Sequence, residues 1–181
     1  MIFKDLWELF TLPFNDNYYL AQPTRKYIFK DKKMTKSVIN IGVSLINIEK
    51  IREDNKDFEI FYYLYKNRFT EQLVINYVCY PKFGYLPFKY GIFANIHRKN
   101  NTYKSYKNLQ LTKKLNLTEL IEAIKDPAIV HILACTPKHW YKRNKHLDKN
   151  NYDVCIKYHR LFYYYAKKTK YYDIIYNKFI H

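Results

Sequence analysis

The 181-residue chain has little glycine, little cysteine and half as many acidic as basic residues, and each shortage excludes a class of protein. Three glycines leave no glycine-rich loop of the kind that binds a phosphate. Cys79, Cys135 and Cys155 are too few and too scattered for a disulfide scaffold and fit a reducing compartment. No apolar run approaches the length of a membrane span, so we expect no transmembrane helix.

The abundant residues point to a biased genome. Lysine, tyrosine, isoleucine, asparagine and phenylalanine make up 94 of the 181 residues, and all five have A/T-rich codons. This bias predicts an A/T-rich genome, such as an organellar or viral one. We therefore discount the many aromatic residues as evidence for base stacking. Hydrophobic residues still reach 48%, which argues against wholesale disorder and suits one domain of ordinary size.

The charge is strongly positive and unevenly distributed. The 32 basic and 16 acidic residues give a net charge of +16, and residues 98–170 alone hold 17 basic and 5 acidic residues, a net +12. Nucleic acid is the commonest partner for such a stripe, because each phosphate contact releases a counterion. A solvated lysine surface inflated by codon bias is the alternative. An anionic membrane is disfavoured, because no basic helix has a clean apolar face.

Local patterns predict an α+β fold, a two-layer arrangement of a mainly antiparallel sheet with helices packed on one face. We expect helices at residues 2–10, Asp57–Lys66, Thr102–Leu111 and Leu117–Lys125, the last with an Asn116–Glu119 capping box. We expect strands at Ser37–Val43, Gln72–Tyr80, Ile92–Lys99, Ala128–Cys135 and Asp153–Tyr165, with an exposed loop at Pro81–Gly91. The predicted organisation is a lead-in at 1–24, one RNA-binding domain at 25–170 and a tail at 171–181.

Two cysteine–histidine pairs were weighed as a zinc site. Cys135 lies four residues before His139, and Cys155 lies four residues before His159. Residues four apart in a strand are about 13 Å apart, too far to bind one metal ion. We therefore predict buried thiols, surface histidines and no metal.

Catalytic patterns are equally weak. The acidic residues gather at Glu49–Glu59 and Glu119–Asp126, which read as exposed helix faces, and no nucleophile stands beside a base in a recognisable pattern. The residues therefore predict a protein that is not an enzyme and needs no cofactor.

A basic surface remains as the candidate binding site. Lysines and asparagines are suited to the phosphates and 2′-hydroxyls by which double-stranded RNA is recognised. The basic candidates are Lys82, Lys89, His97, Arg98, Lys99, Lys138, Lys142, Arg143, Lys145 and Lys149.

Four segments, in order, resemble the universal ribosomal L-five family of the large-subunit central protuberance. They are Lys36–Val43 (KSVINIGV), Phe88–Leu109 (FKYGIFANIHRKNNTYKSYKNL), Thr136–Trp140 (TPKHW) and Asn151–Phe162 (NYDVCIKYHRLF). The predicted order of elements agrees with that of the family.

The resemblance implies a structural protein of a mitochondrial large ribosomal subunit. Its implied partners are 5S or large-subunit rRNA, the P-site tRNA and neighbouring ribosomal proteins, including the small-subunit head protein S-thirteen, but no membrane. The implied RNA-binding residues are Asn40, His97, Arg98, Lys99, Lys138, Lys142, Arg143, Lys149 and Asn151. The implied tRNA-facing loop carries Lys82, Tyr85, Lys89 and Tyr90.

Two other hypotheses stay open at this stage. One is a nuclease or other nucleic-acid enzyme of an A/T-rich virus or plasmid. The other is an accessory subunit of a mitochondrial membrane complex. Codon bias without an import signal favours the mitochondrial matrix and a mitochondrially encoded protein.

Overall fold

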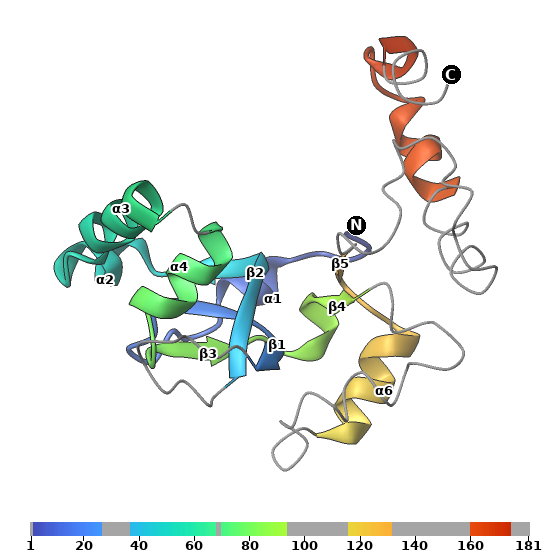
Figure 1. Cartoon of the computed structure of the whole chain (residues 1–181). Helices are drawn as coiled ribbons and strands as arrows, with labels where there is room; N and C mark the ends of the chain where they lie inside the picture. The colour runs from blue at the N-terminus through green and yellow to red at the C-terminus, as the bar shows by residue number, and fades with distance from the viewer. Residues whose placement is uncertain (1, 27–36, 68–69, 94–115, 132–159, 175–181) are drawn as a thin grey trace. The chain divides into compact units, whose positions relative to one another are not determined.

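A computed structural model describes residues 2–26, 37–67, 70–93, 116–131 and 160–174 of the chain (Figure 1). The chain divides into two compact units. The larger unit holds the described residues up to Ile92 and those from Asn116 to Val130. The other described residues, which are Phe93, His131 and 160–174, belong to the second unit.

Short helices and strands follow one another along the described residues. The helices are α1 (Trp7–Phe10), α2 (Ile48–Glu53), α3 (Lys56–Asn67), α4 (Glu71–Val78), the 3-10 helix η1 (Phe88–Tyr90) and α6 (Leu117–Lys125). The strands are β1 (Tyr19–Lys26), β2 (Ser37–Ile46), β3 (Phe83–Tyr85), β4 (Ile92–Phe93) and β5 (Val130–His131). Residues 160–166, in the other unit, are also helical.

The main sheet has the strand order β2-β1-β3. β1 pairs with β2 in antiparallel fashion, with Tyr19 opposite Ile46, and with β3 in parallel fashion, with Tyr19 opposite Phe83. β4 and β5 form a second, two-stranded sheet. The predicted α+β class is therefore confirmed, and β1 is the central strand around which the described part of the larger unit is built.

A buried side chain of α4 bonds to the main chain of β2. Asn76 is fully buried, accepts a hydrogen bond from Ile39 N at 2.7 Å and donates one to Ile39 O at 2.8 Å. These two bonds take the place of those that a neighbouring strand would make to the main chain of Ile39. They matter because a buried main-chain group without a partner is costly. The Asn76 amide thereby ties α4 to β2.

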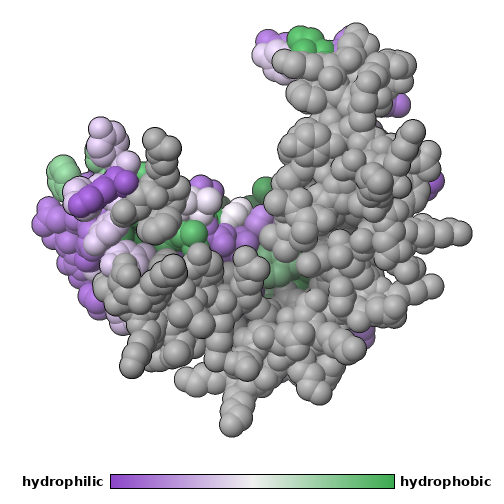
Figure 2. Space-filling model, viewed as in Figure 1, coloured by the Kyte–Doolittle hydropathy of each residue, from purple (hydrophilic) through white to green (hydrophobic). Residues whose placement is uncertain are grey.

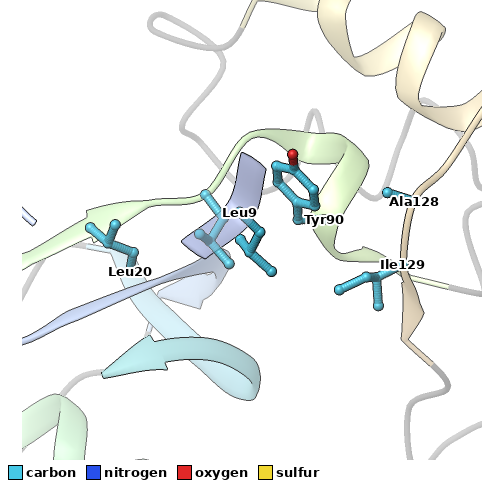
Figure 3. Close-up of a cluster of buried hydrophobic side chains, with 6 residues drawn as sticks. Leu9, Leu20, Tyr90, Ala128 and Ile129 are labelled. Atoms are coloured by element: carbon cyan, nitrogen blue, oxygen red, sulfur yellow. The ribbon is translucent and has the colours of Figure 1, made fainter. Parts of the chain in front are cut away.

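Two hydrophobic clusters form the core. One surrounds β1 and β2 and includes Tyr19, Ala21, Ile39, Ile51 and Cys79. The other gathers Leu9, Leu20, Leu86, Tyr90, Ala128 and Ile129. Figure 3 shows how α1, β1, η1 and the segment before β5 each bring side chains to this second cluster. Helix α1 and the stretch before β5, far apart in sequence, therefore share one core.

Several local predictions are confirmed. Helix α3 and strand β2 occur where their patterns placed them, and α6 begins and ends as predicted. The Asn116 side chain caps α6 by accepting hydrogen bonds from Thr118 N and Glu119 N. The Glu119 carboxylate instead accepts from Phe88 N at 2.9 Å, so it links α6 to η1 where a capping box was expected.

Three local predictions are wrong. Gln72–Tyr80 was expected as a strand but forms α4, so no antiparallel pair spans residues 72–99. Pro81–Gly91 was expected as an exposed loop, yet it contains β3 and η1 and buries Leu86, Phe88 and Tyr90. The final strand expected at Asp153–Tyr165 is helical from residue 160 onward. In the first two cases burial against the rest of the chain outweighed local strand or turn propensity.

Other predictions fall outside the described residues. These are the helix at Thr102–Leu111, the basic stretch after Pro137 and the end of the Ala128–Cys135 strand, of which Val130–His131 is seen as β5. Among the helices that the structure describes, none has the length and apolar content needed to cross a bilayer.

Candidate functional site

A hollow of about 750 Å³ lies against α6, within the range of volumes that small-molecule sites have. Its walls come from the segment before α1, from α1, from η1 and from α6 with the turn that follows it. The residues that line it are Lys4, Glu8, Pro87, Lys89, Glu119, Glu122, Ala123, Lys125 and Asp126. Three ammonium groups and four carboxylates therefore face one space.

The positions of these elements are fixed by bonds from α6 and the segment after it to η1. The Glu119 carboxylate accepts from Phe88 N, and Lys89 O accepts from both Ala128 N at 2.8 Å and Ile129 N at 2.9 Å. The Tyr90 ring is buried in the cluster of Figure 3, and this burial anchors η1 to the core. The Lys89 side chain, next to this anchored ring, lines the hollow.

At the edge of the hollow, the Glu8 carboxylate is bonded to both the Lys89 ammonium group and the Tyr90 hydroxyl. Glu8 Oε2 accepts from Lys89 Nζ at 2.6 Å and from the Tyr90 hydroxyl at 2.9 Å. These hydrogen bonds, the one from Lys89 first, hold the pKa of Glu8 below its ordinary value. The bond from Lys89 to Glu8 raises the pKa of the lysine in turn. Both groups are therefore ionised at neutral pH, and their charges offset each other.

The remaining charges of the hollow differ in how far they are paired. Lys4 Nζ forms an ion pair with Asp126. Among the described residues, neither Glu122 nor Lys125 takes part in an ion pair, and both side chains are exposed on α6. One carboxylate and one ammonium group are thus available to a bound molecule.

A second charged cluster lies where β1 begins. Lys82 Nζ contacts Asp16 at 2.9 Å and Asp54 at 3.8 Å, and Lys50 contacts the same two carboxylates at 3.3 and 3.1 Å. The Tyr18 hydroxyl donates to Asp54 at 2.6 Å. Desolvation, with the Asp54 bond second, raises the pKa of Tyr18 to about 12. Each carboxylate contacts both lysines, so the cluster joins α2 to the start of β1 and β3.

The tRNA-facing loop predicted from sequence is spread over these two clusters. Lys82 belongs to the cluster at the start of β1, whereas Lys89 lines the hollow and Tyr90 donates to Glu8, another lining residue. Tyr85, at the end of β3, is 49% exposed. Asn40 lies on β2, and its side chain accepts from Gly42 N at 3.0 Å. The structure therefore does not gather these residues into one surface.

The other predicted RNA-binding residues lie outside the described residues, so their placement is not tested. They are His97, Arg98, Lys99, Lys138, Lys142, Arg143, Lys149 and Asn151. The four residues weighed for zinc, Cys135, His139, Cys155 and His159, lie there as well. In the part of the chain that is described, no group of three or more histidine, cysteine or acidic side chains is placed to hold a metal ion.

Sequence reasoning named Lys89, but in a tRNA-facing loop, and missed the other charged residues that line the hollow. Glu122 was assigned to an exposed helix face, which is correct, but nothing showed that Lys4 and Glu8 would lie opposite it. The helical spacing of α6 and the acidic residue in α1 were the available signals. Neither reports which distant segment faces the helix.

The chain shares its fold with part of a glycosyltransferase. It matches the apo structure of the bifunctional glycosyltransferase WbbM with a TM-score of 0.61 and 19% identity, over 98% of this chain and 33% of that one. The glycosyltransferase GlyE of Streptococcus pneumoniae matches with a TM-score of 0.49 and 18% identity, over 86% of this chain and 36% of that one. No protein-family model and no curated protein matches. The chain thus spans about a third of the length of each enzyme.

These findings correct the family prediction. The expectation of a ribosomal L-five protein was wrong, because the shared fold is that of a glycosyltransferase. The element order on which the resemblance relied is also absent, since α4 stands where a strand of the expected antiparallel pair was required.

The predictions that rested on that family are wrong as well. A structural role in the ribosome, the lack of enzyme activity, and rRNA, tRNA and S-thirteen as partners are overturned by the match to a glycosyltransferase, an enzyme. The nuclease and the membrane-complex subunit do not match it either. The mitochondrial location and the limits at residues 24 and 170 stay predictions.

Proposed function

We propose that this chain is part of a glycosyltransferase and that the hollow against α6 binds the reacting groups. The observation that carries the proposal is the pairing pattern inside the hollow. Glu122 and Lys125 are left without ion-pair partners among the described residues, while Glu8 and Asp126 are already paired with lysines. The fold shared with WbbM supports the reaction class but assigns no residue.

The proposed chemistry uses the two available charges. In glycosyl transfer, an acceptor hydroxyl oxygen forms a bond to the anomeric carbon, and the bond from that carbon to the leaving oxygen breaks. Glu122 accepts the proton of the acceptor hydroxyl, as a general base does. The electron pair of the broken bond leaves with a phosphate oxygen, whose charge is stabilised by the Lys125 ammonium group.

The rest of the hollow has a positioning role. Because the Tyr90 ring is buried and its hydroxyl bonds to Glu8, the Glu8–Lys89 pair is held in place before any ligand binds. When the side chains of a site are already ordered, less of the binding free energy is lost in ordering them.

The test uses the full chain with nucleoside-diphosphate hexoses as donors and disaccharides as acceptors, and measures both donor binding and sugar release. Glu122→Gln should lower the rate by about 10²–10⁴-fold, the usual contribution of a general base, while donor binding is retained. Lys125→Ala should weaken donor binding. The matched control is Glu49→Gln, an exposed glutamate on α2, which should change neither value.

Two results would overturn the proposal. The first is a chain that binds no donor in the panel. The second is turnover that Glu122→Gln leaves unchanged.

A further inference from the structure

Helix α3 exposes a row of aromatic side chains. Phe58, Phe61, Tyr62 and Tyr65 lie at the helical spacing of one face and are 72%, 70%, 51% and 83% exposed. These four residues, called the aromatic stripe below, formed the pattern that predicted the helix. In Figure 2 the surface over α2 and α3 is mostly hydrophilic, with a few hydrophobic residues among it.

The side of α3 that faces the unit is apolar as well. Ile60 packs against the core cluster around β1 and β2, and the ring of Tyr63 meets that of Tyr77 edge to face at 4.9 Å. A helix that is apolar on both sides is typical of one covered on both sides. The aromatic stripe is therefore the half of α3 that lacks a covering surface among the described residues.

The size of the stripe is that of an interface centre. An aromatic side chain contributes about 150–250 Å² when it is buried, so four rings exposed to this degree present on the order of 500 Å². The largest apolar patch on a typical monomer covers about 300–600 Å² and is often functional. A stable interface buries about 800 Å² on each partner, which the flanking residues of α3 bring within reach.

The local charge allows two copies of this chain to meet here. Residues 48–67 carry five acidic residues (Glu49, Glu53, Asp54, Asp57 and Glu59) and four basic ones (Lys50, Arg52, Lys56 and Lys66), a net −1. The whole chain carries +16, so copies repel each other elsewhere more than here. The same count disfavours an anionic membrane, which attracts basic helices.

The stripe is also complementary to itself in one orientation. In an antiparallel pair centred between Phe61 and Tyr62, Phe58 lies opposite Tyr65 of the second copy, and Phe61 lies opposite Tyr62. Glu59 and Lys66 are seven residues apart and so share one flank of the helix. The same two-fold axis brings Glu59 of each copy beside Lys66 of the other. Glu59 would add this partner to Lys56 of its own helix, at 2.5 Å, and Lys66 would add it to the Tyr62 hydroxyl, at 2.7 Å.

We propose that two copies of this chain associate through antiparallel pairing of their α3 helices, with the aromatic stripes in the centre and two Glu59–Lys66 ion pairs at the edge. Such an interface is isologous, as closed dimers require. The proposal does not depend on the proposed function, because α3 contributes no residue to the hollow.

The experiment is sedimentation equilibrium of the full chain over a concentration series, with thermal unfolding recorded for every variant. The wild-type chain should reach the mass of two copies. Removing the stacked pair of rings with Phe61→Ala and Tyr65→Ala should raise the dissociation constant by at least about a hundredfold, as loss of two central aromatic residues does.

Charge reversal tests the orientation. Glu59→Lys and Lys66→Glu should each weaken association, because like charges then meet across the axis. The double variant E59K/K66E should restore it, although both changes oppose the dipole of α3 and cost helix stability. Glu53→Lys, an exposed charge reversal on α2, is the matched control and should leave association unchanged.

Three outcomes would overturn the proposal: a wild-type chain that stays at the mass of one copy at every concentration, association that survives loss of Phe61 and Tyr65, or a double variant no better than the single ones. A stripe that instead drives pelleting with phosphatidylcholine vesicles would assign it to lipid and would equally refute the dimer.

Discussion

Replacing Asn76 with alanine should destabilise the fold strongly, because its fully buried amide satisfies both main-chain groups of Ile39. An unsatisfied buried polar group costs about 1–3 kcal/mol, so leaving both Ile39 N and Ile39 O unpaired costs about 2–6 kcal/mol. Alanine is the better helix former by about 0.6 kcal/mol, which offsets a small part of the loss. The expected net destabilisation is therefore about 1.5–5 kcal/mol, a large share of the 5–15 kcal/mol typical of a folded domain.

The assay is urea unfolding of the full chain followed by far-ultraviolet circular dichroism. With a denaturant dependence of about 1–3 kcal/mol/M, the unfolding midpoint should fall by roughly 1–2 M. The matched control is Gln72→Ala, another amide on α4, whose side chain is only half-buried and whose loss should cost less than about 0.5 kcal/mol. If Asn76→Ala unfolds at the same midpoint as Gln72→Ala, the amide does not secure β2 as argued.

Three further predictions follow from single contacts. Burial raises the pKa of the Cys79 thiol to about 12, so with the other two cysteines changed to serine it should react with a thiol reagent far more slowly in the folded chain than in urea. Gly91→Ala should cost about 1–3 kcal/mol in urea unfolding, because the new Cβ would lie 2.4 Å from Cγ of buried Gln22. Tyr18→Phe should reduce the loss of stability in acid, because the Tyr18 hydroxyl is the main cause of the lowered pKa of Asp54.

Each of these has a control and a contrary result. The folded and unfolded chains reacting at equal rates would contradict the burial of Cys79. Gly84→Ala should cost less than Gly91→Ala, because its Cβ would meet the ends of two side chains that can move, a terminal methyl of Leu20 at 2.7 Å and the Asn17 amide nitrogen at 3.2 Å. A reversed order would contradict the packing described.

The sign of the acid effect follows from the direction of the pKa shift. A lowered pKa in the folded state means that the unfolded chain binds more protons, so the stabilisation from Asp54 is present above about pH 4 and is lost as the pH falls through the folded pKa. Unfolding midpoints measured across that range should fall less steeply for Tyr18→Phe than for the wild-type chain. Equal slopes would contradict the assigned bond.

Elements that depend on near neighbours were predictable from the sequence. The aromatic spacing identified α3, the β-branched run identified β2, and Asn116 marked the first turn of α6. In each case the signal comes from residues within a turn or two of each other. Which face of α3 packs against the core was not predictable, because periodicity identifies an apolar face but not what that face contacts.

Elements and sites that depend on distant partners were not predictable. Val74 and Val78 favour a strand locally, yet α4 is a helix that buries them and brings Asn76 to Ile39, 37 residues away. The hollow depends on contacts between residues that are still farther apart in the sequence, since Glu8 bonds to Lys89, 81 residues away. No local pattern reports such a pair.

By itself, the sequence determined the charge, the codon-biased composition, the α+β class and the helices and strands with strong local signals. The tertiary structure decided that residues 71–78 form a helix, that Lys82 and Lys89 are engaged in separate ion pairs, and that Glu122 and Lys125 face the same space. The physical reason is that local conformation is set by neighbours along the chain, whereas a site is set by burial that brings distant segments together.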